Sequence, residues 1–199
     1  MRKFFFVAAI SAIFTLVLFL QLSCTGEGEA KPKTQAEMVA LGKYLVHTSA
    51  CDDCHTPKIF TEDGRMILDT TRLLSGHPEG EAIPPLDVSA LGMNWVAGNM
   101  GLTAWVGPWG VSYVANLTPD KATGIGAVTE EMFIKTMREG KLKGVGRSLL
   151  PPMPWEVYRL KTDEDLKAMY AYLMSIKPIR NQVPQPTPPD KAGELLAKK

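Results

Sequence analysis

The residues best suited to chemistry lie together near the start of the chain, in Cys51-Asp52-Asp53-Cys54-His55. They form a C-x-x-C-H motif, the spacing by which a c-type haem is attached. Two thiols three positions apart can form thioethers with the two vinyl groups of one porphyrin, and the adjacent histidine can then reach the iron. The motif therefore predicts one covalent haem c on Cys51 and Cys54, with His55 as an axial ligand of the iron.

Two other kinds of site use similar residues. A thioredoxin-like redox pair is expected at the start of a helix that follows a β-strand, whereas here a helix is expected before the motif. A zinc site needs about four ligands, and the further candidates are Cys24, His47 and His77. The first 23 residues predict an export signal. Export favours a haem site over a redox pair or a zinc site, because haem is attached to exported proteins outside the cytoplasm.

Met153 is the candidate for the sixth iron ligand. It lies in Leu150-Pro151-Pro152-Met153-Pro154-Trp155, where the prolines restrict the backbone and can hold a weak thioether ligand in place. Most of the ten methionines fall instead in the N-terminal segment or at helical core spacing, where methionine is ordinary packing. If Met153 is absent from the iron or labile, the alternative is a haem enzyme or gas sensor with an open distal site.

Several further residues could belong to a haem site, and each has an ordinary structural explanation. His77, in a Gly-Pro loop, could be a second histidine ligand, but a surface or hydrogen-bonding role is expected. His47 is expected to be solvated or packed on the first helix. Arg147 could pair with a haem propionate or be simply exposed. Aromatic residues that could line the pocket, or equally fill a core, are Trp105, Trp109, Trp155 and Tyr158.

The N-terminal segment predicts export. Arg2 and Lys3 precede a mostly apolar stretch from residue 4 to residue 20, and a small residue precedes a possible cleavage point, as in an export signal. Cys24 at this junction resembles the acylated cysteine of a bacterial lipoprotein. The sequence thus predicts a signal over 1–23 and a flexible tether over 24–33.

An uncleaved helical anchor and simple secretion are the alternatives to a lipid on Cys24. All three place residues 34–199 outside the cytoplasm, and the lipoprotein interpretation places them on the periplasmic face of a bacterial membrane.

Three helices are expected to position these residues. Thr34 and Thr162 each precede a predicted helix with the pattern of a capping box. The first of these helices is expected over 35–47, and the last ends before Pro178. Between them, Thr129 caps a helix that carries two acidic residues near its positive end.

The segments between and after these helices show less regularity. Residues 56–128 contain many glycines and prolines, and Asp63-Gly64 predicts a tight hairpin turn. The rest is expected to be a long ordered connection with little regular structure, whose length suggests that it covers something. The proline-rich tail over 179–199 is expected to be extended, with its last residues frayed.

Composition excludes several classes of protein. A chain that is 45% hydrophobic and 22% charged is unlike a disordered one. Its 22 basic and 21 acidic residues lack the basic excess of a nucleic-acid binder. Three cysteines are too few for a disulfide scaffold. The 199 residues suffice for one globular domain with a core, or for two very small domains.

The order of capped helix, C-x-x-C-H, long connection, helix, Pro-Met loop and terminal helix resembles a class I cytochrome c. It is most similar to the monohaem cytochrome c domains associated with periplasmic dehydrogenases. The segment Asn116-Leu117-Thr118-Pro119-Asp120, followed by Thr123-Gly124-Ile125-Gly126, is similar to a segment of those domains, and so is the terminal helix. The resemblance covers roughly 34–178. It departs from the smallest members in the long insertion over 56–115.

This resemblance implies a mainly α fold with a long, irregular insertion between the haem motif and the later helices. By position, it implies thioethers at Cys51 and Cys54, a proximal His55 and a distal Met153. It implies a one-electron carrier with no catalytic residue. The implied partner is a redox protein, namely a dehydrogenase, a membrane complex or an oxidase.

Overall fold

The computed structural model describes residues 31–92 and 94–197. The chain divides after Lys33, and the unit that begins at Thr34 contains the C-x-x-C-H motif and Met153. The predicted export signal, Cys24 and most of the predicted tether lie outside the described residues. None of the helices in residues 31–92 and 94–197 has the length and hydrophobicity of a membrane span.

The three predicted helices form where their caps place them. They are α2 (Gln35–Thr48), α5 (Glu130–Glu139) and α7 (Asp163–Ser175). Thr34 and Thr162 each complete a capping box, in which cap and third residue exchange hydrogen bonds and satisfy free backbone donors. The Thr129 hydroxyl accepts the bond that caps α5. Local sequence therefore determines where all three helices begin.

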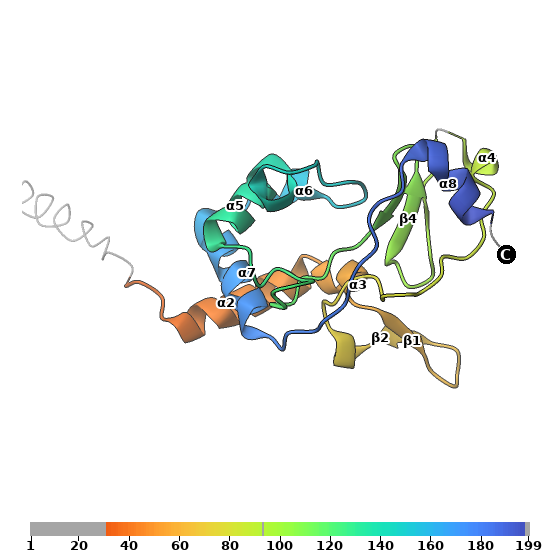
Figure 1. The fold of residues 1–199 in the computed structure, drawn as a ribbon. Helices are drawn as coiled ribbons and strands as arrows, with labels where there is room; N and C mark the ends of the chain where they lie inside the picture. The colour runs from red at the N-terminus through yellow and green to blue at the C-terminus, as the bar shows by residue number, and fades with distance from the viewer. Residues whose placement is uncertain (1–30, 93, 198–199) are drawn as a thin grey trace, which may run out of the picture. The chain divides into compact units, whose positions relative to one another are not determined.

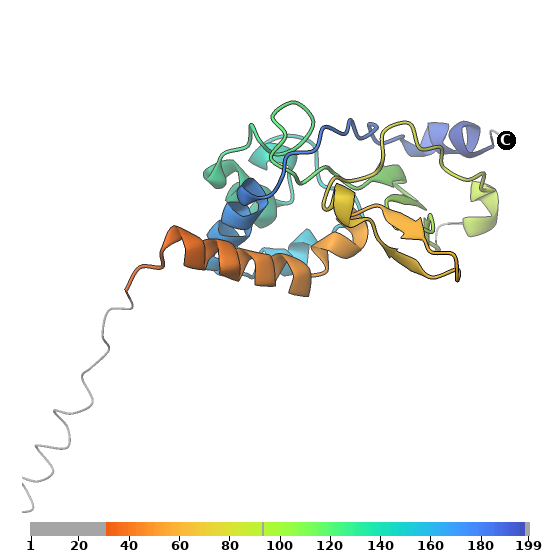
Figure 2. The same ribbon diagram turned by 90° about the horizontal axis from the view of Figure 1, so that it is seen from below.

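Helices α2 and α7 pack closely against each other, as Figures 1 and 2 show. Their contact depends on Gly42, because a Cβ there would lie 1.8 Å from the carbonyl oxygen of Ala168. The close approach buries Val46, Leu166 and Leu173 in the larger of the two apolar cores found among the described residues. Helix α5 joins this core through Phe133 and Met137. This core forms one side of the candidate site.

The predicted hairpin turn is confirmed. Strands β1 (Lys58–Phe60) and β2 (Met66–Leu68) pair antiparallel across the Asp63-Gly64 turn, and Gly64 has a positive φ of 78°. The hairpin directly follows the C-x-x-C-H motif. A short 3-10 helix, η1 (Thr70–Arg72), leads from it into the loop that contains His77.

The expectation of little regular structure over 56–128 is wrong for residues 97–113, whereas 114–128 contain no helix or strand. After α4 (Val88–Leu91), the strands β3 (Ala97–Gly98), β4 (Ala104–Gly107) and β5 (Gly110–Tyr113) form an antiparallel sheet in that order. These strands have two to four residues each, too few for a clear period-two pattern in the sequence. Contacts with the C-terminal segment stabilise them, and the local sequence does not show those contacts. Over the described residues the fold is accordingly mixed, with helices and two small sheets, rather than mainly α.

The C-terminal tail is extended over 179–188, but the expectation of an extended end is wrong for α8 (Pro189–Leu196). Proline is favourable at the start of a helix, where its missing N–H is not needed. Ala192 and Leu196 of α8 pack on Val106 and Val111 of the sheet to form the second apolar core. So short a helix is stable because the sheet covers its apolar face.

Candidate haem site

The motif residues lie on α3 (Cys51–His55), a short helix directly after α2. Ala50 has a left-handed conformation, with a φ of 57°, and turns the chain between the two helices. Cys51 and His55 are buried, each 8% exposed, while Cys54 is half-buried. Both cysteines are free thiols. The turn at Ala50 sets α3 at the end of α2 so that the side chains of Cys51 and His55 face the interior.

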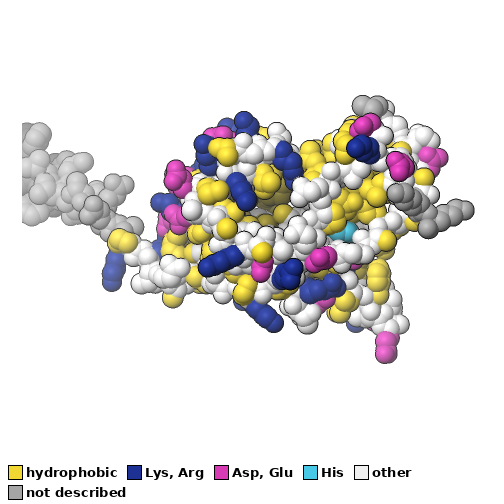
Figure 3. Space-filling model, in the orientation of Figure 1, with side chains coloured by type: hydrophobic (Ala, Val, Ile, Leu, Met, Phe, Trp, Pro, Cys, Tyr) yellow, Lys and Arg dark blue, Asp and Glu magenta, His cyan; other side chains and the backbone are white. Residues whose placement is uncertain are grey.

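A cavity of about 400 Å³ lies beside α3. Its wall includes Cys51, Cys54, His55 and Met153, so the four residues predicted to bind haem surround one cavity although they come from segments about 100 positions apart. The hollowed face in Figure 3 shows hydrophobic side chains inside the hollow. A largely apolar cavity of this size, with few polar groups, is typical of a cofactor site.

His55 is held in one orientation by a hydrogen bond to the backbone. Its Nδ1 lies 2.7 Å from the carbonyl oxygen of Ala115, and since a carbonyl only accepts, Nδ1 carries the proton. The other ring nitrogen, Nε2, is then free of a proton and available to a metal. Burial lowers the pKa of His55, which also favours the neutral imidazole that ligates metals.

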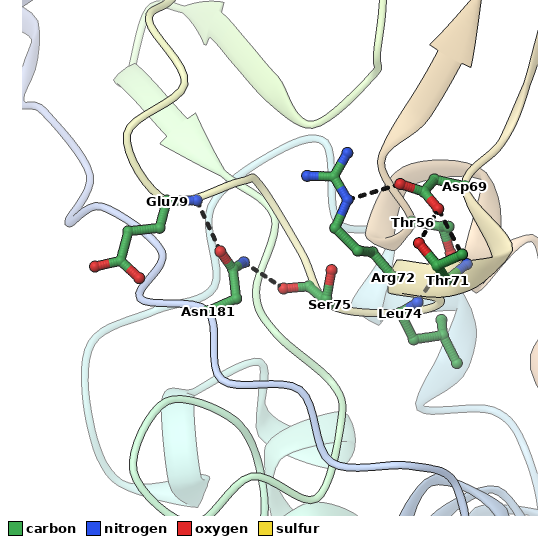
Figure 4. A network of polar contacts seen from close by, with 8 residues as sticks. All are labelled: Thr56, Asp69, Thr71, Arg72, Leu74, Ser75, Glu79 and Asn181. Carbon is green, nitrogen blue, oxygen red and sulfur yellow. Dashed lines mark hydrogen bonds and ion pairs between the residues drawn. The ribbon is translucent and has the colours of Figure 1, made fainter.

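The Ala115 carbonyl is brought to His55 by the loop that follows η1. The backbone N–H of Leu74 donates to Thr56 Oγ1 at 3.0 Å, drawn in Figure 4, and that of Gly76 donates to the His55 carbonyl at 2.8 Å. Gly76 has a φ of 82°, and a Cβ there would lie 2.7 Å from the backbone of Ala115. Only glycine permits this close passage without strain.

Met153 lies half-buried in the loop between α5 and α6 (Trp155–Tyr158). The backbone N–H of Met153 donates to the Leu150 carbonyl at 3.3 Å, and its own carbonyl accepts from Trp155 at 2.9 Å. Ser112 of β5 donates to the Pro151 carbonyl at 2.7 Å and ties the loop to the sheet. Hydrogen bonds within and outside the loop therefore fix the backbone around the thioether.

Two further methionines, Met137 and Met169, also line the cavity. Both are buried in the larger core, 8% and 2% exposed, as their helical spacing predicted. The sequence placed them in a core without showing that this core borders the cavity. Met153 differs from them in lying on a loop.

Tyr158 connects the Met153 side of the cavity with the cysteine side. Its hydroxyl donates to the Ser49 carbonyl at 2.7 Å, just before Cys51 in the chain. Burial raises the pKa of Tyr158 to about 12, so the hydroxyl remains a donor at neutral pH. Tyr158 and Trp105 are in the cavity wall. Trp109 and Trp155 are not in the wall; Trp109 donates to Ser112, and Trp155 packs on Gly140.

The pKa values of the Cys51 and Cys54 thiols are shifted in the direction opposite to that of a reactive dithiol. Burial raises the pKa of Cys51 to about 12 and also raises the pKa of Cys54. Redox-active C-x-x-C pairs need a lowered pKa, because the thiolate is the reactive form. In the described part of the chain, no three His, Cys, Asp or Glu side chains are grouped so as to hold a metal ion.

The charges of the wall suit a cofactor that carries carboxylates. Lys143 and Arg147 line the cavity, and none of the acidic residues that the structure describes does so. Haem carries two propionates, for which lysine and arginine are suitable partners. The apolar interior, the two thiols and the oriented histidine fit the rest of the group. The residues present therefore fit a haem.

The two remaining histidines are engaged in hydrogen bonds. His77 is fully buried outside the cavity wall, with Nδ1 3.0 Å from Thr103 Oγ1 and Nε2 3.3 Å from the Glu81 carbonyl. His47 donates from Nδ1 to Asp52 at 2.8 Å, and its Nε2 lies 3.3 Å from the Tyr172 hydroxyl. His77 thus has a hydrogen-bonding role and is not on the surface, while His47, expected to be solvated or packed, is partly exposed and hydrogen-bonded.

Comparison with known proteins found no matching family model. The chain is 48% identical over 137 residues to the gluconate 2-dehydrogenase cytochrome c subunit of Pantoea cypripedii, covering 69% of this chain and 23% of that protein. It is 29% identical over 158 residues to the cytochrome c subunit of the quinone alcohol dehydrogenase of Gluconobacter oxydans, covering 79% and 25%. It is 42% identical over 85 residues to the fructose dehydrogenase cytochrome subunit of Gluconobacter japonicus, covering 40% and 17%.

The chain thus spans a quarter or less of the length of these relatives. All three names designate a cytochrome subunit of a dehydrogenase, and two of them specify cytochrome c. Such homologues are electron-transfer subunits rather than catalytic ones. Cytochrome c implies covalently bound haem, which is the group that C-x-x-C-H attaches.

Proposed function

We propose that this chain is a one-electron carrier. It binds a single haem c covalently through Cys51 and Cys54, with His55 and Met153 as axial ligands of the iron. The observation that carries the proposal is the position of these four side chains around one largely apolar cavity. The similarity to cytochrome c subunits of dehydrogenases supports it independently.

The bound haem supplies an iron that alternates between the ferrous and ferric states. His55, oriented by the Ala115 carbonyl, presents Nε2 to the cavity in a fixed tautomer. The Met153 thioether, compared with a second imidazole, favours the ferrous state and raises the reduction potential. The apolar wall excludes water, so that little must rearrange when the charge changes. No residue needs to act as an acid, base or nucleophile.

The redox partner is a dehydrogenase or another respiratory complex. Relatives named as subunits of gluconate and alcohol dehydrogenases support this class of partner. The domain over 34–178 follows an export signal (1–23) and a tether (24–33). A lipid on Cys24 would keep it on the periplasmic face of a bacterial membrane, close to a membrane-bound partner.

The optical spectrum of the holoprotein, made with a c-haem maturation system, tests the proposal. A ferric sulfur-to-iron band, and a reduced spectrum that carbon monoxide leaves unchanged, are expected for His/Met ligation. Covalent haem without this band, together with immediate carbon monoxide binding, would replace the carrier by a haem enzyme or gas sensor. Absence of covalent haem on a denaturing gel would contradict both.

A further inference from the structure

The extended segment after α7 forms part of the cavity wall. Residues 182–186, here called the C-terminal strap, all line the cavity that contains Cys51, Cys54, His55 and Met153. The strap has the sequence Gln-Val-Pro-Gln-Pro and carries no charge. It lies beyond the segment that resembles a cytochrome c, so neither the motif nor the resemblance gives it a role.

Asn181 anchors the start of the strap. Its side-chain amide donates to the carbonyls of Ser75 and His77 at 2.6 and 2.8 Å, and its Oδ1 accepts from the backbone N–H of Glu79 at 2.7 Å. Figure 4 shows Asn181 between Ser75 and Glu79. The residue is buried, 8% exposed, and its side-chain oxygen and nitrogen both have partners. This geometry joins the strap to the insertion loop that also carries Gly76.

A second set of bonds holds the same point to the segment that precedes α5. The backbone N–H of Asn181 donates to Thr123 Oγ1 at 3.0 Å. Asn116 donates from Nδ2 to the Ile179 carbonyl at 2.8 Å, and Thr118 accepts from the Ile179 N–H at 3.0 Å. Asn181 therefore lies where the insertion, the 116–123 segment and the C-terminal tail meet.

The far end of the strap is fixed to the sheet. Thr187 and Val111 exchange two backbone hydrogen bonds of 2.8 and 2.9 Å. Directly afterwards, α8 packs Ala192 and Leu196 on the same strand. Between the anchors at Asn181 and Thr187, the chain has five residues in which to follow the cavity, so its path is closely restricted.

We propose that Asn181 is a positioning residue for the haem site, and that it holds the C-terminal strap as a wall against the haem. This rests on the proposed function, since it requires haem in the cavity. Asn181 itself is not in the cavity wall and acts through residues 182–186.

The strap should influence the iron by excluding water. A dry, uncharged surrounding disfavours the additional positive charge of the ferric state, and burial is one of the means by which a protein sets a haem potential. Loosening the strap should therefore lower the reduction potential. It should also alter the electronic environment of the haem methyl groups nearest to the strap.

The test compares Asn181→Ala with Asn99→Ala in the full-length holoprotein. Asn99 is a matched control because its side chain also makes three loop hydrogen bonds, to Thr103 and Ala104, but it is not in this cavity wall. We expect Asn181→Ala to lower the midpoint potential and to shift at least one haem methyl resonance of the ferric protein. Asn99→Ala should change neither, although both variants lose stability.

Thr187→Pro provides a second variant in case Asn181→Ala yields no folded holoprotein. It removes the N–H that donates to Val111 and loosens the other end of the strap. We expect the same direction of change in potential and resonances. Wild-type values in the strap variants, or equal changes in Asn99→Ala, would overturn the role of the strap. Absence of haem from the wild type would instead contradict the proposed function.

Discussion

The Nδ1 atom of His55 lies 2.7 Å from the carbonyl oxygen of Ala115, a residue 60 positions later in the chain. Side-chain substitution at Ala115 cannot remove a backbone carbonyl, so the bond depends on the path of the chain through 114–116. That path is fixed by the contact with Gly76 and by the bonds around Asn116. The insertion therefore contributes to the orientation of the proposed proximal ligand.

Met153→Ala should retain covalent haem and open the distal position. We expect loss of the sulfur-to-iron band in the ferric protein and carbon monoxide binding to the reduced protein. Met137→Leu is the matched control, since Met137 lines the same cavity from the helical core. It should keep the wild-type band. An unchanged ligand field in Met153→Ala would exclude Met153 as the ligand.

Tyr158→Phe should weaken the hold on the Met153 loop. Loss of one hydrogen bond to Ser49 should raise the affinity of the ferric holoprotein for imidazole about 2- to 10-fold, because a net hydrogen bond is worth about 0.5–1.5 kcal/mol. Tyr170→Phe loses a similar bond, to Val128 at 2.8 Å, but lies outside the cavity wall. It should lose stability without any change in imidazole affinity. Equal affinities in the two variants would show that Tyr158 has a purely structural role.

Gly42→Ala should destabilise the protein, since the new Cβ would meet the backbone of α7 at 1.8 Å. We expect the free energy of unfolding, measured by denaturant titration, to fall by about 1–3 kcal/mol. Gly193→Ala in α8 is the matched control, because its nearest neighbour, Val88, is at an ordinary 3.6 Å. It should gain up to about 1 kcal/mol from helix propensity. A Gly42→Ala protein as stable as the wild type would contradict the close crossing of α2 and α7.

His77 should make the folded protein sensitive to mild acid. Burial lowers its pKa below the ordinary 6.5, although the neighbouring Glu81 opposes this shift. Thr103 and Tyr113 are the other groups that face the ring. As pH falls below 6.5, the unfolded chain binds a proton that the folded chain does not, so the free energy of unfolding falls until the folded-state pKa is reached.

The corresponding measurement is the free energy of unfolding of the holoprotein between about pH 8 and about pH 5. His77→Gln removes the titrating group while keeping an amide that can form hydrogen bonds, and its stability should depend less on pH. Parallel curves for wild type and variant would show that His77 does not contribute.

Cys24→Ser tests the predicted lipid anchor, which lies outside the described residues. If Cys24 is acylated, this variant should appear in the soluble periplasmic fraction while the wild type remains with the membrane. A variant that still behaves as an integral membrane protein would favour an uncleaved N-terminal anchor.

The sequence by itself determined the features that depend on neighbours in the chain. Capping residues located α2, α5 and α7, and Asp63-Gly64 located the hairpin turn. The C-x-x-C-H spacing and the proline-bracketed Met153 identified the candidate site without any tertiary information. In each case the interacting groups are a few positions apart, so their types and spacing contain the physical cause.

Only the tertiary structure decided how the site is enclosed. The Ala115 carbonyl, the sheet of β3, β4 and β5, and the strap held by Asn181 all depend on contacts between distant segments. Every residue has a backbone carbonyl, so the sequence does not mark the one at Ala115 as a hydrogen-bond partner of His55. Helix α8 is stable only against a sheet that lies nearly 80 residues earlier in the chain. Such hydrogen bonds and apolar contacts form only once folding has brought the segments together, and for that reason local sequence patterns did not predict them.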